Sequence, residues 1–356
     1  MPSARSTRRL AGLIACAVVT TTAFVPAQGQ SGADKPDRAK ELCMGRTSSP
    51  DERLAGCNAI IEGKTESGRL LAAAFCNRGH AWTERQQYER AIADFDEGIK
   101  VDATYACLFN NRGRAWNLLK EYDKAIADLD EAVRLDPKFT IAYNNRGVAW
   151  RNKGDLERAV ADFSESLRHD WNYATAYDNR AAAYLKLGKT DQALVDFSMV
   201  IDLRPSIFAF INRGNAYRDL DQFDDAIADY TGVVEHWPDD ARGWRNRGFV
   251  KLLKNDLKGA IADYDKAIKF DPHDAFSFNN RGMAFARRKQ LDKALADYDA
   301  ALRLTPDNPT LHVNRGDALR DKGNRNAAIA AYRAALAIKP GFAEALRGLE
   351  AAGAKP

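Results

Sequence analysis

The sequence has almost no net charge and few of the residues on which metal sites depend. Lys and Arg number 53 against 49 Asp and Glu, and 356 residues include only five His and five Cys. Nucleic-acid-binding proteins usually keep a strong basic excess, so that class is disfavoured. The histidines are scattered and no two cysteines form a CxxC pair, which argues against zinc. We therefore expect neither nucleic acid nor metal as a ligand.

Signatures of common enzyme families are also missing. The sequence has no GxSxG, HExxH or EF-hand pattern. GKT occurs at 63–65 and 188–190, but a phosphate-binding loop also needs a glycine five residues before the glycine of GKT. Those two positions hold Asn58 and Ala183. No stretch outside the repeated part of the chain is long enough for a catalytic domain. We expect no enzymatic activity, no cofactor and no small-molecule substrate.

Long apolar runs are missing except near the start of the chain. Three arginines precede a mostly apolar stretch at 10–24, and Val25 and Ala27 are small residues suited to a cleavage site. Because a membrane-spanning helix needs about 20 apolar residues, the pattern predicts a secretory signal peptide over 1–27. We expect an exported protein, periplasmic or secreted. The alternative is a lipoprotein held to the membrane by a lipid on Cys16, which ends a local LIAC pattern.

Four cysteines follow the predicted leader. In an oxidising compartment an even number favours disulfides. Cys43 and Cys57 flank the turn-like segment GRTSSPDE, and a bridge between them would contribute about 3 kcal/mol. The alternative is two free buried thiols. Whether Cys76 and Cys107 pair is left open.

What the sequence does have is a tripeptide, Asn-Arg-Gly or once Asn-Arg-Ala, that occurs eight times at spacings of 34 residues and once of 33. If the arginine is placed seventh in each unit, the eighth place is Gly or Ala and the twentieth is always Ala. The twenty-fourth place is large and apolar, and the thirty-second is Pro in six units. Places four, seven, eight and eleven share one helical face, as do places twenty, twenty-four and twenty-seven. Each unit is therefore predicted to form two helices and a turn that the proline closes.

This 34-residue unit closely resembles the tetratricopeptide repeat. The resemblance implies an all-α, right-handed α-solenoid of eight helix-turn-helix units whose first helices line a concave groove. We expect a linker and disulfide-stapled cap over 28–71, repeats over 72–342, and a cap helix and tail over 343–356. The predicted units are 72–105, 106–139, 140–173, 174–206, 207–240, 241–274, 275–308 and 309–342. An arginine in the seventh place departs from the family, which more often has an aliphatic residue there.

The seventh-place arginine needs a partner, since an unpaired buried charge costs several kcal/mol. The twenty-third place is Asp in seven units and Ala331 in the eighth. Each arginine can pair within its unit, as Arg78 with Asp94, or across the junction, as Arg112 with Asp94. At the junction between the eighth unit and the cap helix, the aspartate is replaced by Ala331 and the next arginine by Leu349. Because both charged residues are lost at the same junction, pairing across the junction is favoured. A third alternative points the arginine into the groove as a ligand contact.

The sixth place is asparagine in every unit. An amide offers both a donor and an acceptor, so a row of asparagines along the first helices could hold the backbone of an extended peptide. Neighbouring helices lie about 8–10 Å apart, so one rung would meet roughly every third ligand residue. The alternative is a purely local packing role. The candidate ladder consists of Asn77, Asn111, Asn145, Asn179, Asn212, Asn246, Asn280 and Asn314.

The other groove positions vary, and units five to seven carry more aromatic and basic residues. The candidate hot spot consists of Phe208, Arg242, Arg245, Phe249 and Phe276. The carboxylate-clamp pattern of the family is not reproduced. We expect a non-enzymatic scaffold or adaptor that binds an extended peptide segment of a protein partner. The alternatives are an accessory subunit of a cell-envelope or secretion enzyme complex, and a nucleic-acid reader built from helical repeats.

Overall fold

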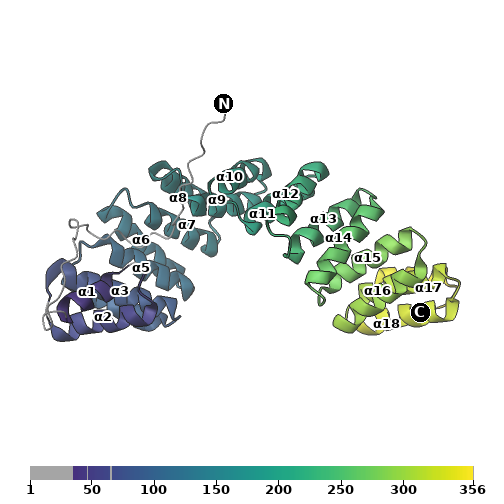
Figure 1. The fold of residues 1–356 in the computed structure, drawn as a ribbon, viewed down its shortest axis with the longest axis horizontal. Coiled ribbons are helices and arrows are strands. Elements are labelled where there is room, and N and C mark those ends of the chain that lie inside the picture. The colour runs from purple at the N-terminus through teal and green to yellow at the C-terminus, as the bar shows by residue number, and fades with distance from the viewer. Residues whose placement is uncertain (1–34, 46, 65, 356) are drawn as a thin grey trace, which may run out of the picture. The chain divides into compact units, whose positions relative to one another are not determined.

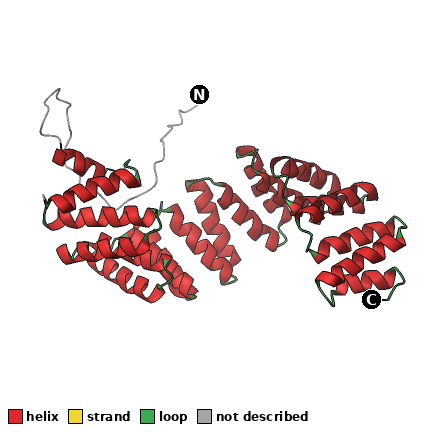
Figure 2. Cartoon of the chain, turned by 90° about the horizontal axis from the view of Figure 1, so that it is seen from below, coloured by secondary structure: helices red, strands yellow, loops and turns green. Residues whose placement is uncertain are grey.

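The structure, a computed structural model, describes residues 35–45, 47–64 and 66–355, and all the regular secondary structure there is α-helix (Figure 2). The predicted leader and Cys16 lie outside these residues. No helix in the described part of the chain is long and apolar enough to cross a membrane. The all-α prediction is confirmed.

Fourteen of the helices pack as seven of the predicted pairs, each consisting of a first and a second helix (Figure 1). The fourth predicted unit contains the first helix α9 and the second helix α10. The first helices are α3 (Gly68–Glu84), α5 (Ala106–Leu118), α7 (Thr140–Lys153), α9 (Ala174–Lys186), α11 (Ile207–Asp219), α13 (Ala241–Leu253), α15 (Ala275–Arg287) and α17 (Pro309–Asp321). The second helices are α4 (Tyr88–Val101), α6 (Tyr122–Leu135), α8 (Leu156–His169), α10 (Thr190–Leu203), α12 (Phe223–His236), α14 (Leu257–Phe270), α16 (Leu291–Leu304) and α18 (Arg325–Ile338).

Close packing within a pair depends on the small residue in the eighth place. In the third pair, a Cβ on Gly147 would lie 2.6 Å from the Cε1 atom of Phe163. Phe163 and Ala159 of the second helix are both fully buried. A Cβ on Gly147 would press on the ring of Phe163, so the ring or the helices would have to shift, and this place limits how closely the two helices pack.

The chain divides into two compact units, with the boundary between Leu187 and Gly188. The first begins with α1 (Lys35–Met44) and α2 (Pro50–Gly63), and α2 packs on α3. A disulfide joins Cys43 of α1 to Cys57 of α2, as predicted. Cys76 is a buried free thiol and so does not pair with Cys107.

The second unit ends with α19 (Ala343–Ala351), which packs on α17 and α18. Leu349 of α19 is fully buried, and its neighbour Gly348 faces the ring of Tyr332. The last helix therefore covers the apolar face that the eighth pair would otherwise expose.

Candidate binding surface

The seventh-place arginine binds the aspartate of its own unit, so the favoured pairing with the twenty-third-place aspartate of the preceding unit is wrong. Nε and Nη2 of Arg146 donate to the two carboxylate oxygens of Asp162 at 2.8 and 2.7 Å. The same two-pronged bond recurs in Arg78–Asp94, Arg112–Asp128, Arg213–Asp229, Arg247–Asp263 and Arg281–Asp297.

The third arginine nitrogen crosses the junction, but to the twenty-fifth place of the preceding unit. Nη1 of Arg146 donates to Asp130 at 2.7 Å, and Nη1 of Arg180 donates to Ser164 at 2.9 Å. The guanidinium of Arg146 thus joins its first helix to the second helices of two units. The remaining junction partners are Asp96 for Arg112, Ser198 for Arg213, Thr231 for Arg247 and Asp265 for Arg281.

The two ends of the array depart from this pattern. In the eighth unit Ala331 replaces the aspartate, and Nε of Arg315 donates instead to Asp299 of the preceding unit at 2.6 Å. In the first unit Nη1 of Arg78 donates to Asn58 of the cap helix α2 at 2.8 Å. The cap therefore continues the junction contact that a preceding repeat would make.

These ion pairs are largely removed from solvent. The side chains of Arg146 and Asp162 are 19% and 9% exposed. The hydrogen bonds to Asp162 raise the pKa of Arg146 above its usual value, so the guanidinium stays charged. Burial raises the pKa of Asp162, and the hydrogen bonds from Arg146 oppose that shift. Because Nε, Nη1 and Nη2 of Arg146 are all engaged, its role here is to hold helices together.

Several of the ladder asparagines connect neighbouring first helices. The amide of Asn145 donates to Asn110, and the amide of Asn179 donates to Asn144, both at 2.9 Å. In each case the acceptor is the fifth-place residue of the preceding unit. The same connection runs from Asn314 to Asn279, from Asn111 to the sulfur of Cys76 and, at the cap, from Asn77 to the sulfur of Met44.

The remaining ladder residues differ. Asn280 is buried and donates to the backbone carbonyl of Phe276 in its own helix. Asn212 and Asn246 are half-buried on α11 and α13. Asn246 makes no side-chain hydrogen bond within the described residues, because the fifth-place residue of the preceding unit is Ile211. Binding of a peptide by the asparagines stays a prediction.

The hydrogen bond from Asn111 to Cys76 is shielded from solvent, since Cys76 is buried. Burial raises the pKa of its thiol to about 12, and the hydrogen bond from Asn111 opposes the shift. The sulfur is therefore a neutral acceptor at physiological pH and an unreactive thiol.

The five hot-spot residues lie together on α11, α13 and α15, in the second of the two compact units. The guanidinium of Arg242 lies over the ring of Phe208, 4.8 Å from its centre. Arg245 lies 5.9 Å from the ring centre of Phe276, and the ring centres of Phe276 and Phe249 are 5.7 Å apart. Phe208 and Phe276 are 64% and 44% exposed, which is unusual for phenylalanine.

Two aspartates balance the charge of this cluster. Asp240 accepts from Nε and Nη2 of Arg242, and these bonds lower the pKa of its carboxyl group. Asp274 lies 3.9 Å from Nη1 of Arg245. Both aspartates also cap their helices, since each accepts from a backbone N–H two residues on. Neither aspartate is among the residues that the sequence predicts for this surface.

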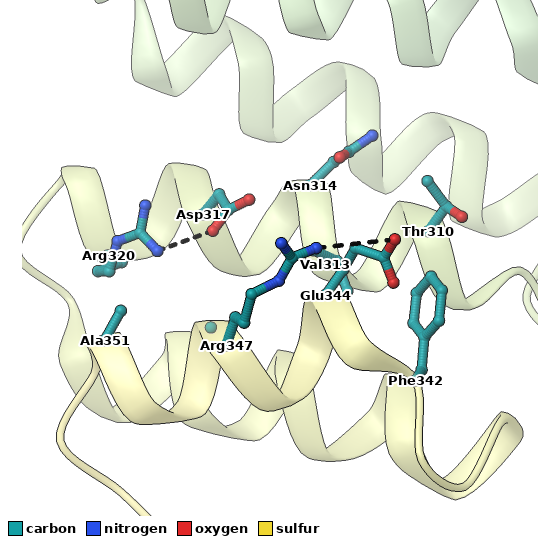
Figure 3. A pocket seen from close by; sticks show the side chains of 10 residues that line it. Thr310, Val313, Asn314, Asp317, Arg320, Phe342, Glu344, Arg347 and Ala351 are labelled. Carbon is teal, nitrogen blue, oxygen red and sulfur yellow. Dashed lines mark ion pairs between the residues drawn. The ribbon is translucent and has the colours of Figure 1, made fainter.

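A cavity of about 500 Å³ lies between α17 and α19, and sequence reasoning missed it (Figure 3). Its charges form pairs, Arg320 with Asp317 at 2.9 Å and Arg347 with Glu344 at 3.9 Å. A second cavity of about 470 Å³ lies in the first of the two compact units, and it is lined largely by turns between repeats. Within the described residues no group of three or more His, Cys, Asp or Glu could hold a metal ion.

Three solved structures illustrate what the chain is similar to. The Cut9–Hcn1 hetero-tetramer of the APC/C is 18% identical, with a TM-score of 0.49; the alignment covers 90% of this chain and 63% of that one. A tetratricopeptide repeat protein of Parabacteroides merdae is 19% identical over 69% of this chain and 97% of its own, with a TM-score of 0.49. The pilF protein of Pseudomonas aeruginosa is 15% identical over 60% and 96%, also with a TM-score of 0.49.

No match was found among curated proteins. Models of protein families do match the repeats. A TPR repeat model matches residues 282–323, and tetratricopeptide repeat models match 106–139, 211–275, 263–296 and 309–342. These matches fall on consecutive helix pairs that pack as the 34-residue period predicts. The chain belongs to the tetratricopeptide repeat family.

Proposed function

We propose that the protein is an exported, non-enzymatic scaffold that binds an extended segment of another protein along its first helices. Repeats of this family serve protein interaction, and first helices in the second compact unit carry the exposed aromatic residues. The observation that carries the proposal is the exposure of Phe208 and Phe276, each beneath an arginine side chain. Aromatic residues and arginine are the commonest energetic centres of protein interfaces.

Export is supported by the leader-like N-terminus and by the disulfide between Cys43 and Cys57. Disulfides persist in the periplasm and outside the cell, whereas cytosolic thiols stay reduced. Fractionation of cells that express the full chain tests this proposal. We expect a shortened chain in the exported fraction; a full-length chain confined to the cytosol would contradict it.

Binding is tested by co-purification with the tagged full chain from an extract of its own cells. We compare the wild type with the double variant Phe208→Ala/Phe276→Ala. The matched control is Trp171→Ala/Val195→Ala, which removes side chains that are 65% and 64% exposed but lie outside the first helices. We expect the first variant alone to lose the partner. Equal recovery with all three proteins would contradict a binding surface on the first helices.

A further inference from the structure

On α13, two side-chain donors have no acceptor. Arg245, half-exposed, makes no hydrogen bond within the described residues, and its nearest acid, Asp274, lies 3.9 Å away. The two oxygens of Asp274 are already occupied at the start of α15. The neighbouring Asn246 also has no hydrogen-bond partner there, whereas Asn145, Asn179 and Asn314 at the same place are engaged. Residues 242, 245, 246 and 249 share one face of this helix.

A third donor lies beneath this face. In the described part of the chain, the hydroxyl of Tyr264 is the one buried side-chain polar atom without a hydrogen-bond partner. The equivalent Tyr230 in unit five donates to the ninth-place Asn215 at 2.7 Å. In unit six the ninth place is Phe249, which cannot accept. The ring of Tyr264 packs against Gly248, the residue before Phe249.

The electrostatic surroundings of Tyr264 connect it to the same surface. Burial raises the pKa of its hydroxyl, and the charges of Asp274 and Arg245 also act on it. A buried hydroxyl without a hydrogen-bond partner destabilises the fold, because it has given up its bonds to water. The fold therefore keeps a destabilising donor beneath the half-buried Phe249, next to the exposed Phe276.

We propose that Arg245, Asn246, Phe249 and Phe276, here called the unit-six subsite, bind an apolar side chain of a partner segment together with the carboxylate of an adjacent acidic residue. The apolar side chain packs against the two rings, and the carboxylate accepts from Arg245 and Asn246. The ring of Phe249 turns outward when the segment binds, so that the hydroxyl of Tyr264 donates to a ligand oxygen. This inference rests on the proposed function and adds the chemistry of the partner.

The charges around the subsite favour one carboxylate over a nucleic acid. Arg242 is paired with Asp240 at 2.8 Å, and the neighbouring Arg218 is paired with Asp219 at 2.7 Å. Arg245 alone keeps its hydrogen-bond donors free. A chain of phosphates would meet the carboxylates of Asp219, Asp240 and Asp274, whereas a single carboxylate bound by Arg245 and Asn246 has only Asp274 among these acids beside it.

The test uses the full chain and a library of random twelve-residue peptides displayed for selection. We expect the selected peptides to share Asp or Glu next to a large apolar residue. Arg245→Gln should weaken the best peptide roughly tenfold or more, because a charge-assisted hydrogen bond is lost. Tyr264→Phe should weaken it roughly fivefold without lowering the melting temperature.

The matched control is Tyr332→Phe, at the same place in unit eight, whose hydroxyl donates to Asp317 at 2.8 Å. This variant should lower the melting temperature and leave peptide affinity unchanged. Tight peptides that lack the acidic–apolar pair, or that ignore Arg245→Gln and Tyr264→Phe, would overturn the subsite but leave the proposed function standing. Selection of no peptide at all would contradict both, and salt-sensitive binding of a uridine 20-mer in place of peptides would assign the surface to nucleic acid.

Discussion

Early and late in the chain the seventh-place arginine reaches an aspartate of the preceding unit, whereas in the middle it reaches a hydroxyl. The charged partners are Asp96, Asp130, Asp265 and Asp299, and the neutral ones are Ser164, Ser198 and Thr231. All seven bonds are charge-assisted because the guanidinium donor is ionised, but an aspartate acceptor adds the attraction of a full negative charge. The middle junctions are therefore the more weakly tied.

Two of the three junctions with a hydroxyl partner, those of Arg213 and Arg247, involve α11 and α13 of the candidate binding surface, whereas its third helix, α15, is joined through Asp265. Arg247, which donates to Thr231 at 3.1 Å, lies on α13 beside Arg245 and Asn246. Surfaces that rearrange on binding are drawn from the less stable parts of a fold. The proposed movement of Phe249, on α13, would therefore take place beside a junction whose partner is a neutral hydroxyl.

The largest effect is expected from removing an arginine that has two acidic partners. Arg146→Leu leaves the buried Asp162 without its counter-charge and should lower the free energy of unfolding by about 3 kcal/mol. Arg315→Leu is the matched control, because Ala331 stands in place of the buried acid and Asp299 is 44% exposed. Its cost should stay below about 1 kcal/mol. Urea unfolding followed by circular dichroism measures both, and equal losses would refute the central role of the buried pair.

The register of the helix pair could have predicted this pairing from sequence. The 34-residue period is enough to predict the helices, and in the structure the eighth-place Gly147 lies against Ala159 of its own unit. The same antiparallel register places the seventh-place Arg146 opposite Asp162. The residues at the end of the array, Ala331 and Leu349, led to the wrong prediction that the arginine pairs with the preceding twenty-third-place aspartate. The arginine does reach across each junction, but to the residue in the twenty-fifth place.

The binding surface was harder to predict. The residues Phe208, Arg242, Arg245, Phe249 and Phe276 stand out in the sequence as aromatic and basic residues at groove positions of units five to seven, and they do lie together. Which donors remain free could not be read from sequence, because it depends on the acceptors that neighbouring helices supply. The orphan hydroxyl of Tyr264 appears only when the ninth place is compared between packed units.

A smaller effect is expected from exchanging the two kinds of junction. Asp130→Ser should cost about 0.5–1 kcal/mol, because its carboxylate is 57% exposed and solvent weakens the ion pair. Ser164→Asp should stabilise by a similar amount, since it recreates the paired aspartates found at other junctions. Both changes should shrink in 1 M salt, where surface charges are screened. Shifts that persist in high salt would point to packing in place of charge.

Native-state hydrogen exchange tests the account most directly, because it reports the opening of each junction separately. We compare amides of α6 and α7, joined through Asp130 and Arg146, with those of α12 and α13, joined through Thr231 and Arg247. We predict exchange in α12 and α13 that is roughly two- to fivefold faster than in α6 and α7, and Thr231→Asp should slow it toward the rate of α6 and α7. Equal rates in the wild type, or no response to Thr231→Asp, would contradict it.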